Sequence, residues 1–336
     1  MAMDNRHALA FLNSTEWSAA RRVFLAGDAS DRRYERLYLG YKTAVLMDAP
    51  PGKGDDPADF ITIAAHLNGL GLSAPRIFAQ DLVNGFLLIE DLGDALFARL
   101  LKQDQSREAE FYAAATDVLS HLQTSPAPVN LPNLTAGEWA LAAGFALDWY
   151  RFAVVGDTGK GADFYATLTR LIETHADGPR VLILRDYHAE NLLWLPDRSG
   201  IARAGLLDFQ LAQMGQPAYD LVSLLQDARR DVSLETETAM VARFRKDADP
   251  DVFSKGYAVF GAQRALRILG IFARLCLVGG KAHYVDLIPR VWRQLQRNLA
   301  HPALADLAEI CASEVPEPTP QALERIRAQC GNNPAR

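Results

Sequence analysis

The sequence predicts an α+β protein of two lobes. A small N-terminal lobe with an antiparallel sheet (residues 1–90) is followed by a hinge at 91–94 and a larger, mostly helical C-terminal lobe (95–336). Short runs of alternating polar and apolar residues, separated by turn residues, predict the strands of the first lobe. Apolar residues that recur every three or four positions predict the helices of the second. Within the second lobe, strand-like apolar runs enclose a polar cluster at 181–210.

The composition is that of a soluble globular protein. The chain has 336 residues, of which 49% are hydrophobic and 23% charged, and its net charge is −6. This charge, without a run of basic residues, argues against nucleic-acid binding. The cysteines lack the spacing of metal ligands, and no apolar run reaches the ~20 residues of a membrane helix. We expect a cytoplasmic protein without nucleic-acid or membrane partners, whose oligomeric state stays open.

The N-terminal lobe is predicted from five strand-like runs and two helical ones. The strands are expected at 23–25, 32–39, 43–47, 73–81 and 86–89, and the helices at 6–20 and 57–70. A loop of small residues joins the first two strands, and kinases use such a loop to cover nucleotide phosphates. We expect Ser30 in this loop, and Arg32 or Arg33 after it, to contact a nucleotide, because an arginine fork fits phosphate oxygens.

The C-terminal lobe is predicted from helical periodicity. Helices are expected at 107–123, 136–154, 234–246, 250–277 and 284–299, and another begins near Asp220. The stretch at 136–154 carries an aromatic stripe at helical spacing, which indicates packing in a core. In the helix at 250–277, Gln263 and Arg264 share one side with Arg267 and form a polar stripe in an otherwise apolar segment.

The polar cluster carries the chemistry. Asp186 is followed five positions later by Asn191, and Asp208 ends another apolar run before Phe209. Phosphoryl transfer by a kinase uses such a set, because one Asp orients the acceptor hydroxyl while an Asn and a second Asp hold Mg²⁺. Carboxylate and amide oxygens suit this hard cation. We therefore predict a phosphotransferase that uses ATP and Mg²⁺, with Asp186 as catalytic residue and Asn191 and Asp208 as metal ligands.

These segments resemble the aminoglycoside phosphotransferase and choline kinase superfamily, which has the protein-kinase-like fold. The catalytic loop of that superfamily reads H-G-D-x-H-x-x-N. Residues 184–191 read L-R-D-Y-H-A-E-N and match at the Asp, the second His and the Asn, but not at the leading His-Gly. The Asp of the superfamily's metal site is followed by P-x-x-D-L, which residues 217–221 match as P-A-Y-D-L. The resemblance implies that Asp220 braces the catalytic loop, beside its helix-capping role.

A closer resemblance is to the bacterial anomeric kinases that phosphorylate N-acetylmuramate and N-acetylglucosamine in cell-wall recycling. The segments that carry it are G-D-A-S-D-R-R-Y at 27–34, L-R-D-Y-H-A-E-N-L-L-W-L at 184–195 and Q-R-A-L-R-I-L-G at 263–270. This resemblance implies an amino-sugar acceptor that is phosphorylated at its anomeric hydroxyl. The residues implied in binding that sugar are Tyr187, His188, Gln263 and Arg264.

The resemblance also implies where the nucleotide base lies. A break in the strand pattern at 90–94 corresponds to the hinge of a kinase-like fold, whose backbone hydrogen-bonds the adenine edge. Glu90 and Leu92 are the residues implied in this contact. The expected partners are therefore a nucleotide and a small sugar.

The chain departs from kinases where they grip the phosphates. The third strand of a kinase ends in a lysine that pairs with a Glu of the next helix. Here Met47 takes the aligned position, and residues 57–70 contain no Glu. Arg32, Arg33, Lys42 and Lys53 are the alternatives for the missing cation. If none of them binds the phosphates, the protein is a pseudokinase binding module. The alternative for the acceptor is an aminoglycoside, choline or thiamine.

Overall fold

The protein was analysed as a computed structural model that describes residues 5–27, 32–52 and 54–333. These residues fall into two compact units. Unit 1 comprises Met1–Leu131 and Leu184–Gln213, and unit 2 comprises Pro132–Ile183 and Met214–Arg336. The expected hinge at 91–94 lies inside unit 1, and the predicted division into lobes stays a prediction.

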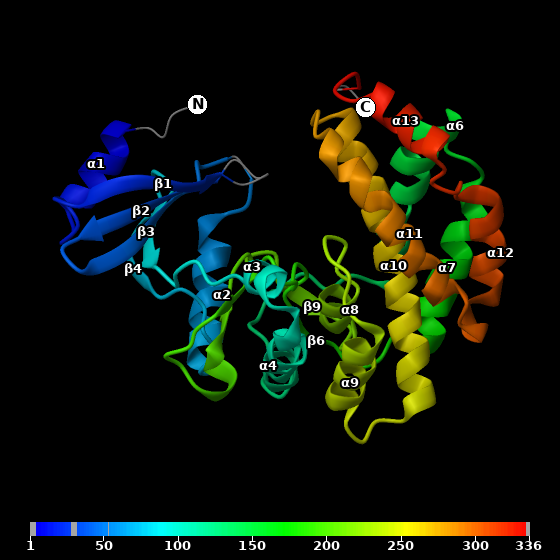
Figure 1. The fold of residues 1–336 in the computed structure, drawn as a ribbon, viewed down its shortest axis with the longest axis horizontal. Helices are drawn as coiled ribbons and strands as arrows, with labels where there is room; N and C mark the ends of the chain where they lie inside the picture. The colour runs from blue at the N-terminus through cyan, green and yellow to red at the C-terminus, as the bar shows by residue number, and fades with distance from the viewer. Residues whose placement is uncertain (1–4, 28–31, 53, 334–336) are drawn as a thin grey trace. The chain divides into compact units, whose positions relative to one another are not determined.

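Unit 1 is built on a five-stranded antiparallel sheet (Figure 1). Its strands, in the order β1-β2-β3-β5-β4, are β1 (Arg21–Gly27), β2 (Arg33–Leu39), β3 (Lys42–Asp48), β5 (Phe86–Glu90) and β4 (Ile77–Asp81). Gly85, with φ +78°, makes the β4–β5 turn, where a Cβ would lie 2.0 Å from the Ala49 carbonyl oxygen. All five predicted strands are present, and with the helices of unit 2 they confirm the predicted α+β class.

Helices and two short strands complete unit 1. They are α1 (Asn5–Asn13), α2 (Pro57–Gly69), α3 (Phe97–Gln103) and α4 (Glu108–Leu122), followed by the short strands β7 (Leu192–Trp194) and β8 (Ala204–Leu206). Phe11 and Leu12 of α1 pack with Leu46 and Leu88 in one apolar cluster on a face of the sheet. The Asp56 carboxylate caps α2 by accepting from the Ala58 N–H at 2.8 Å, as the preference of Asp for this position predicts.

Unit 2 is mainly helical and contains one pair of short strands. Its helices are α5 (Ala136–Ala143), α6 (Phe152–Val155), α7 (Gly161–His175), α8 (Tyr219–Leu225), α9 (Leu234–Arg245), α10 (Pro250–Leu277), α11 (Ile288–Leu299), α12 (Ala305–Glu314) and α13 (Pro320–Ala328). Strand β6 (Val181–Ile183) pairs with β9 (Gln213–Gly215). In the described ranges of the chain, no helix is long and apolar enough to cross a bilayer.

The helix predicted at 136–154 is instead three segments. Helix α5 ends at Ala143, a π-helical turn covers Ala146–Arg151, and α6 follows. The break coincides with a close approach of α10, since a Cβ at Gly270 would lie 2.0 Å from the Phe145 carbonyl oxygen. Only a glycine lets the two backbones come this near, and the sequence around 145 gives no sign of a partner so far along the chain.

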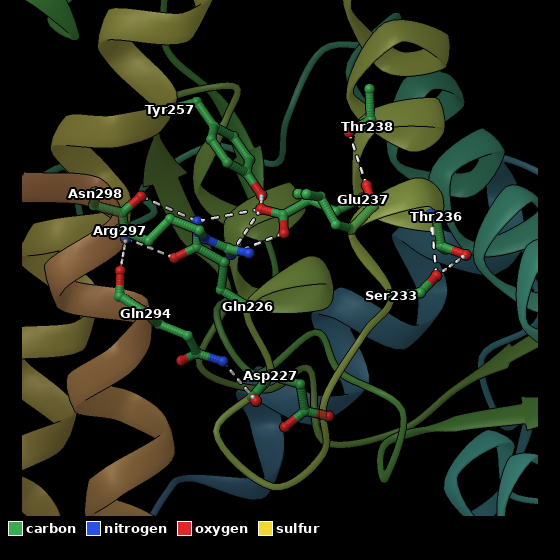
Figure 2. A network of polar contacts seen from close by, with 11 residues as sticks. Gln226, Asp227, Ser233, Thr236, Glu237, Thr238, Tyr257, Gln294, Arg297 and Asn298 are labelled. Atoms are coloured by element: carbon green, nitrogen blue, oxygen red, sulfur yellow. Dashed lines mark hydrogen bonds and ion pairs between the residues drawn. The ribbon is translucent and has the colours of Figure 1, made fainter. Parts of the chain in front are cut away.

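A buried polar network joins Gln226, the residue after α8, to α9, α10 and α11 of unit 2 (Figure 2). Glu237 of α9 is 6% exposed and lies at the centre of the network. Its Oε1 accepts from the Tyr257 hydroxyl at 2.8 Å and from an Arg297 guanidinium N–H at 3.0 Å. Gln226 and Asn298 complete the network with reciprocal amide hydrogen bonds at 3.1 and 2.7 Å. Burial next to this carboxylate raises the pKa of Tyr257 well above its ordinary value.

We expect Glu237→Ala to lower the free energy of unfolding by about 1–3 kcal/mol, because the buried Tyr257 hydroxyl loses its acceptor. Urea unfolding followed by circular dichroism measures the change. Glu235→Ala in the same helix is the control, since Glu235 is exposed. Equal stability of the two variants would contradict a stabilising role for the network.

Candidate active site

The predicted catalytic loop, residues 184–191, lies between β6 and β7. The side chain of Asn191, its last residue, hydrogen-bonds back to the backbone of the loop. The Asn191 side-chain amide donates to the Asp186 carbonyl oxygen at 2.9 Å. Arg185, just before Asp186, adopts a left-handed φ of +71°. Such a φ is uncommon for a residue with a Cβ, and residues held in this way concentrate at functional sites. The backbone at Asp186 is thus held by its neighbour Arg185 and by Asn191, and the Asp186 side chain is half-buried.

Asp208 lies next to this loop because β7 and β8 form a hairpin. Leu192 pairs with Leu206, so Asn191 and Asp208 sit just beyond the paired ends. The Asp208 Oδ2 lies 3.5 Å from the Asn191 Nδ2. Asp208 also has a left-handed φ, +57°. The structure therefore brings together the Asp, Asn and Asp that the spacing singled out.

The two predicted metal ligands fit Mg²⁺ in their chemistry. The Asn191 Nδ2 is turned toward two oxygens, so its Oδ1 remains as the acceptor. The Asp208 carboxylate is 33% exposed and supplies the negative charge. One carboxylate and one amide oxygen are a typical protein contribution to a Mg²⁺ site that nucleotide phosphates complete.

Tyr187 and His188 follow Asp186 and are both buried. The Tyr187 hydroxyl donates to the Ala115 carbonyl oxygen of α4 at 2.9 Å, which ties the loop to that helix. The His188 Nε2 lies 3.5 Å from the Asn191 Nδ2, and 4% of the residue is exposed. In this structure both side chains support the loop, and their contact with a sugar stays a prediction.

A cavity of about 560 Å³ opens beside Asn191 and Asp208 within unit 1. Its lining includes the apolar side chains of Leu25, Val45, Ile89, Leu193 and Leu207. Residues 90–94, the predicted hinge, line the cavity as well. A concave site of this volume, with apolar and polar lining side chains, is the usual form of a small-ligand site.

The predicted hinge residues are placed at the edge of the cavity. The Glu90 carboxylate pairs with Arg198 at 2.8 Å and Arg76 at 3.2 Å. Leu92 makes no backbone hydrogen bond within the part of the chain that the structure describes. Its N–H and C=O are therefore open to a ligand. Arg36 of β2 bridges Asp91 and Asp94, which fastens this segment to the sheet.

Met47 and Lys42 are both unsuited to grip phosphates. Met47 is fully buried. Lys42 pairs with Leu39, at the opposite end of β2 from Arg33, which corresponds to about 20 Å along the strand. Its ammonium group pairs with Glu16 at 2.7 Å. Ser30 and Lys53, two further candidates for phosphate contact, lie outside the described residues.

Arg32 is the predicted cation that the structure places next to Asp208. Its guanidinium Nη2 lies 3.0 Å from the Asp208 Oδ1 and 3.6 Å from the Asp55 Oδ2, and the side chain is 5% exposed. Arg33 begins β2 opposite Asp48 and is half-buried. The predicted contact of either arginine with phosphates stays a prediction.

Asp55 and Gln210 belong to the same cluster, although sequence reasoning did not select them. The Gln210 amide donates to the Asp208 Oδ1 at 2.9 Å and to the Asp55 Oδ2 at 3.2 Å. Gln210 follows Asp208 by two positions, and this closeness in sequence could have indicated that it belongs to the site. Nothing local in the sequence marks Asp55, because its contacts are all distant along the chain.

The other predicted site residues lie in unit 2. The Gln263 side chain is fully buried and donates to the Trp139 carbonyl oxygen at 2.8 Å. Arg264, 6% exposed, donates to the Ser223 hydroxyl at 2.8 Å. Asp220 is buried in the first turn of α8. Their roles in sugar binding and loop support stay predictions.

The model of the phosphotransferase enzyme family matches residues 22–254. An N-acetylmuramate/N-acetylglucosamine kinase of Caulobacter vibrioides is 39% identical over 89% of this chain and 93% of its own length. A protein of the same name from Pseudomonas aeruginosa is 33% identical over 88% of each chain.

Solved structures show the same fold at low identity. A choline kinase from Streptococcus pneumoniae aligns with a TM-score of 0.58 at 14% identity, over 90% of this chain and 98% of its own. The GDP complex of aminoglycoside 2′-phosphotransferase-IIIa aligns with a TM-score of 0.58 at 17% identity, over 89% and 99%. The ADP-bound aminoglycoside phosphotransferase APH(2″)-Ib has a TM-score of 0.57 at 14% identity, over 91% and 99%.

Proposed function

Because the chain belongs to the phosphotransferase enzyme family, we propose that it is a kinase that transfers the γ-phosphoryl group of ATP to N-acetylmuramate and N-acetylglucosamine. The observation that carries the proposal is the contact of Asn191 with both Asp186 and Asp208 beside a cavity of nucleotide size. The names of the relatives from Caulobacter and Pseudomonas support the acceptors. Both sugars are components of the bacterial cell wall, so the reaction belongs to peptidoglycan recycling.

The residues divide the chemistry between them. Asp186 orients the acceptor hydroxyl and takes its proton as the sugar oxygen bonds to the γ-phosphorus and the bond to the β-phosphate oxygen breaks, which releases ADP. Asn191 and Asp208 hold Mg²⁺, which when bound neutralises charge on the phosphates. The backbone at Glu90 and Leu92 binds the base. Catalysis by such a set rests on positioning and electrostatic stabilisation.

The proposed acceptor atom is the anomeric hydroxyl, at C1 of the sugar. This hydroxyl is more acidic than the other hydroxyls of a hexose, so a carboxylate such as Asp186 can take its proton. In a productive complex the C1 oxygen lies within about 2.6–3.2 Å of an Asp186 carboxylate oxygen.

The product should carry its phosphate on C1. Two-dimensional phosphorus–proton NMR of the product of ATP and N-acetylglucosamine measures this, because only a C1 phosphate couples to the anomeric proton. The matched control is a substrate with a methyl glycoside at C1, which keeps every other hydroxyl and should not be phosphorylated.

The same assay separates the competing functions. A phosphate found on C6 would contradict the anomeric assignment. Turnover of choline, thiamine or an aminoglycoside, without turnover of either N-acetylated sugar, would contradict the acceptor class. Nucleotide binding without turnover of any acceptor would favour a pseudokinase binding module.

A further inference from the structure

We propose that Asp55 is a positioning residue for the Mg²⁺ ligand Asp208. In this arrangement Asp55 shares the Arg32 guanidinium with Asp208, and Gln210 joins the two carboxylates. One oxygen of Asp208 is thereby fixed, and the other is left for the cation. The inference rests on the proposed function, in which Asp208 holds Mg²⁺.

The geometry separates the two oxygens of the Asp208 carboxylate. Its Oδ1 accepts from the Arg32 Nη2 at 3.0 Å and from the Gln210 Nε2 at 2.9 Å. Its Oδ2 faces the Asn191 side chain, the other predicted metal ligand, at 3.5 Å. Two hydrogen bonds to one oxygen fix the plane of the carboxylate and direct Oδ2 toward the site. They also hold a residue whose own backbone is in the left-handed region.

Asp55 limits how strongly Arg32 binds Asp208. A guanidinium with a single acidic neighbour neutralises the charge of that carboxylate, which then attracts a cation less strongly. Among the residues that the structure describes, the Arg32 Nη2 has two acidic neighbours, Asp208 at 3.0 Å and Asp55 at 3.6 Å. Arg32, Asp55 and Asp208 carry charges of one positive and two negative, and Gln210 carries none. One negative charge therefore remains in this group to attract Mg²⁺.

The pairing of Arg32 with Asp55 differs from the lysine–glutamate pair of kinases, which this sequence lacks. In kinases the buried pair joins the lysine of the third strand to a Glu of the next helix. Here that strand position holds the fully buried Met47. The charged pair is formed instead by Arg32, just before β2, and Asp55, just before α2. Because Arg32 contacts Asp208, this pair acts on the predicted metal ligand.

Mg²⁺-dependent ADP binding, measured by calorimetry, tests the proposal. The readout is the ratio of ADP affinity in Mg²⁺ to ADP affinity in EDTA. Asp55→Asn should lower this ratio about tenfold, the lower end of what a lost partner of a metal ligand costs. ADP affinity in EDTA should stay near that of the wild type. Asp55→Glu, which keeps the charge, should restore most of the ratio.

A double variant makes the test specific. Adding Arg32→Gln to Asp55→Asn removes the arginine that captures Asp208 and returns the group to one net negative charge. The ratio should therefore rise above that of Asp55→Asn alone. A merely structural role for Asp55 predicts the opposite, because two losses of packing add. If Arg32→Gln fails to fold, Arg32→Met tests the same step with a neutral side chain that keeps the apolar stem.

The outcomes are distinguishable from failure of the proposed function. An unchanged ratio in Asp55→Asn, or a further fall in the double variant, overturns this proposal. Phosphorylation of N-acetylglucosamine by the wild type leaves the proposed function standing in either case. Weaker ADP binding by Arg32→Gln in EDTA, with the ratio intact, would show that Arg32 grips phosphates, and this too overturns it. No ADP binding by the wild type would overturn both. Arg21→Gln, an exposed arginine of β1 at the far end of the sheet, is the control.

Discussion

We expect Asp186→Asn to lower the turnover number by at least ~100-fold, which is the scale of a lost general base. The amide cannot take the acceptor proton, although it keeps the shape of the carboxylate. The Asn191 amide bonds to the backbone carbonyl of residue 186, not to its side chain, so the loop should keep its conformation. ADP affinity should therefore be nearly unchanged. A coupled ADP-release assay and calorimetry measure the two quantities.

Asp197→Asn is the matched control for this variant. Asp197 is exposed in the turn after β7, so its substitution makes the same chemical change outside the site. Near-normal turnover of Asp186→Asn would remove Asp186 from the mechanism. A parallel loss of ADP binding would indicate that the substitution had disturbed the loop.

Asp208→Ala should abolish the effect of Mg²⁺ on nucleotide binding. Asp208 is the only carboxylate of the proposed ligand pair, and the neutral Asn191 amide alone binds Mg²⁺ poorly. ADP affinity should then be the same in Mg²⁺ and in EDTA, and turnover should be lost. Calorimetric titration under the two conditions measures this directly.

The conservative variant Asp208→Asn separates charge from shape. It keeps an oxygen at the position of the ligand but loses the charge, so the effect of Mg²⁺ should remain weak. Asp197→Ala should show the full effect of Mg²⁺. If Asp208→Ala retains a Mg²⁺-dependent gain in affinity, the cation lies elsewhere.

The central contacts of the site could be predicted because they are local in the chain. Asn191 and Asp208 flank two short apolar runs that read as a hairpin, and the pairing of Leu192 with Leu206 brings them together. The pairing of β2 with β3 could be predicted for the same reason, since polar and apolar residues alternate in β2 and the chain turns at Gly40 into the apolar run of β3. Period and spacing carry this information directly.

The rest depends on contacts between distant segments. The pairing of Arg32 with Asp208 joins residues 176 positions apart, and no periodicity records it. Helix α7 was not predicted, although its buried residues Phe164, Leu168 and Leu171 have helical spacing. The break between α5 and α6 depends on Gly270, in another helix. Tertiary packing decided these features, and propensity did not.

The guanidinium beside Asp208 has a consequence for chemical probes and inhibitors. An electrophile that is carried on a nucleotide and aimed at an amine would find no lysine along the described lining of the cavity. Arg32, the cation paired with Asp208, stays protonated and is not a nucleophile at neutral pH. Across the described residues, the cavity therefore offers no amine for covalent capture. Because the Arg32 guanidinium is 5% exposed and already pairs with Asp208 and Asp55, a reversible ligand should rely on the apolar side chains that line the cavity instead, such as Val45, Ile89 and Leu207.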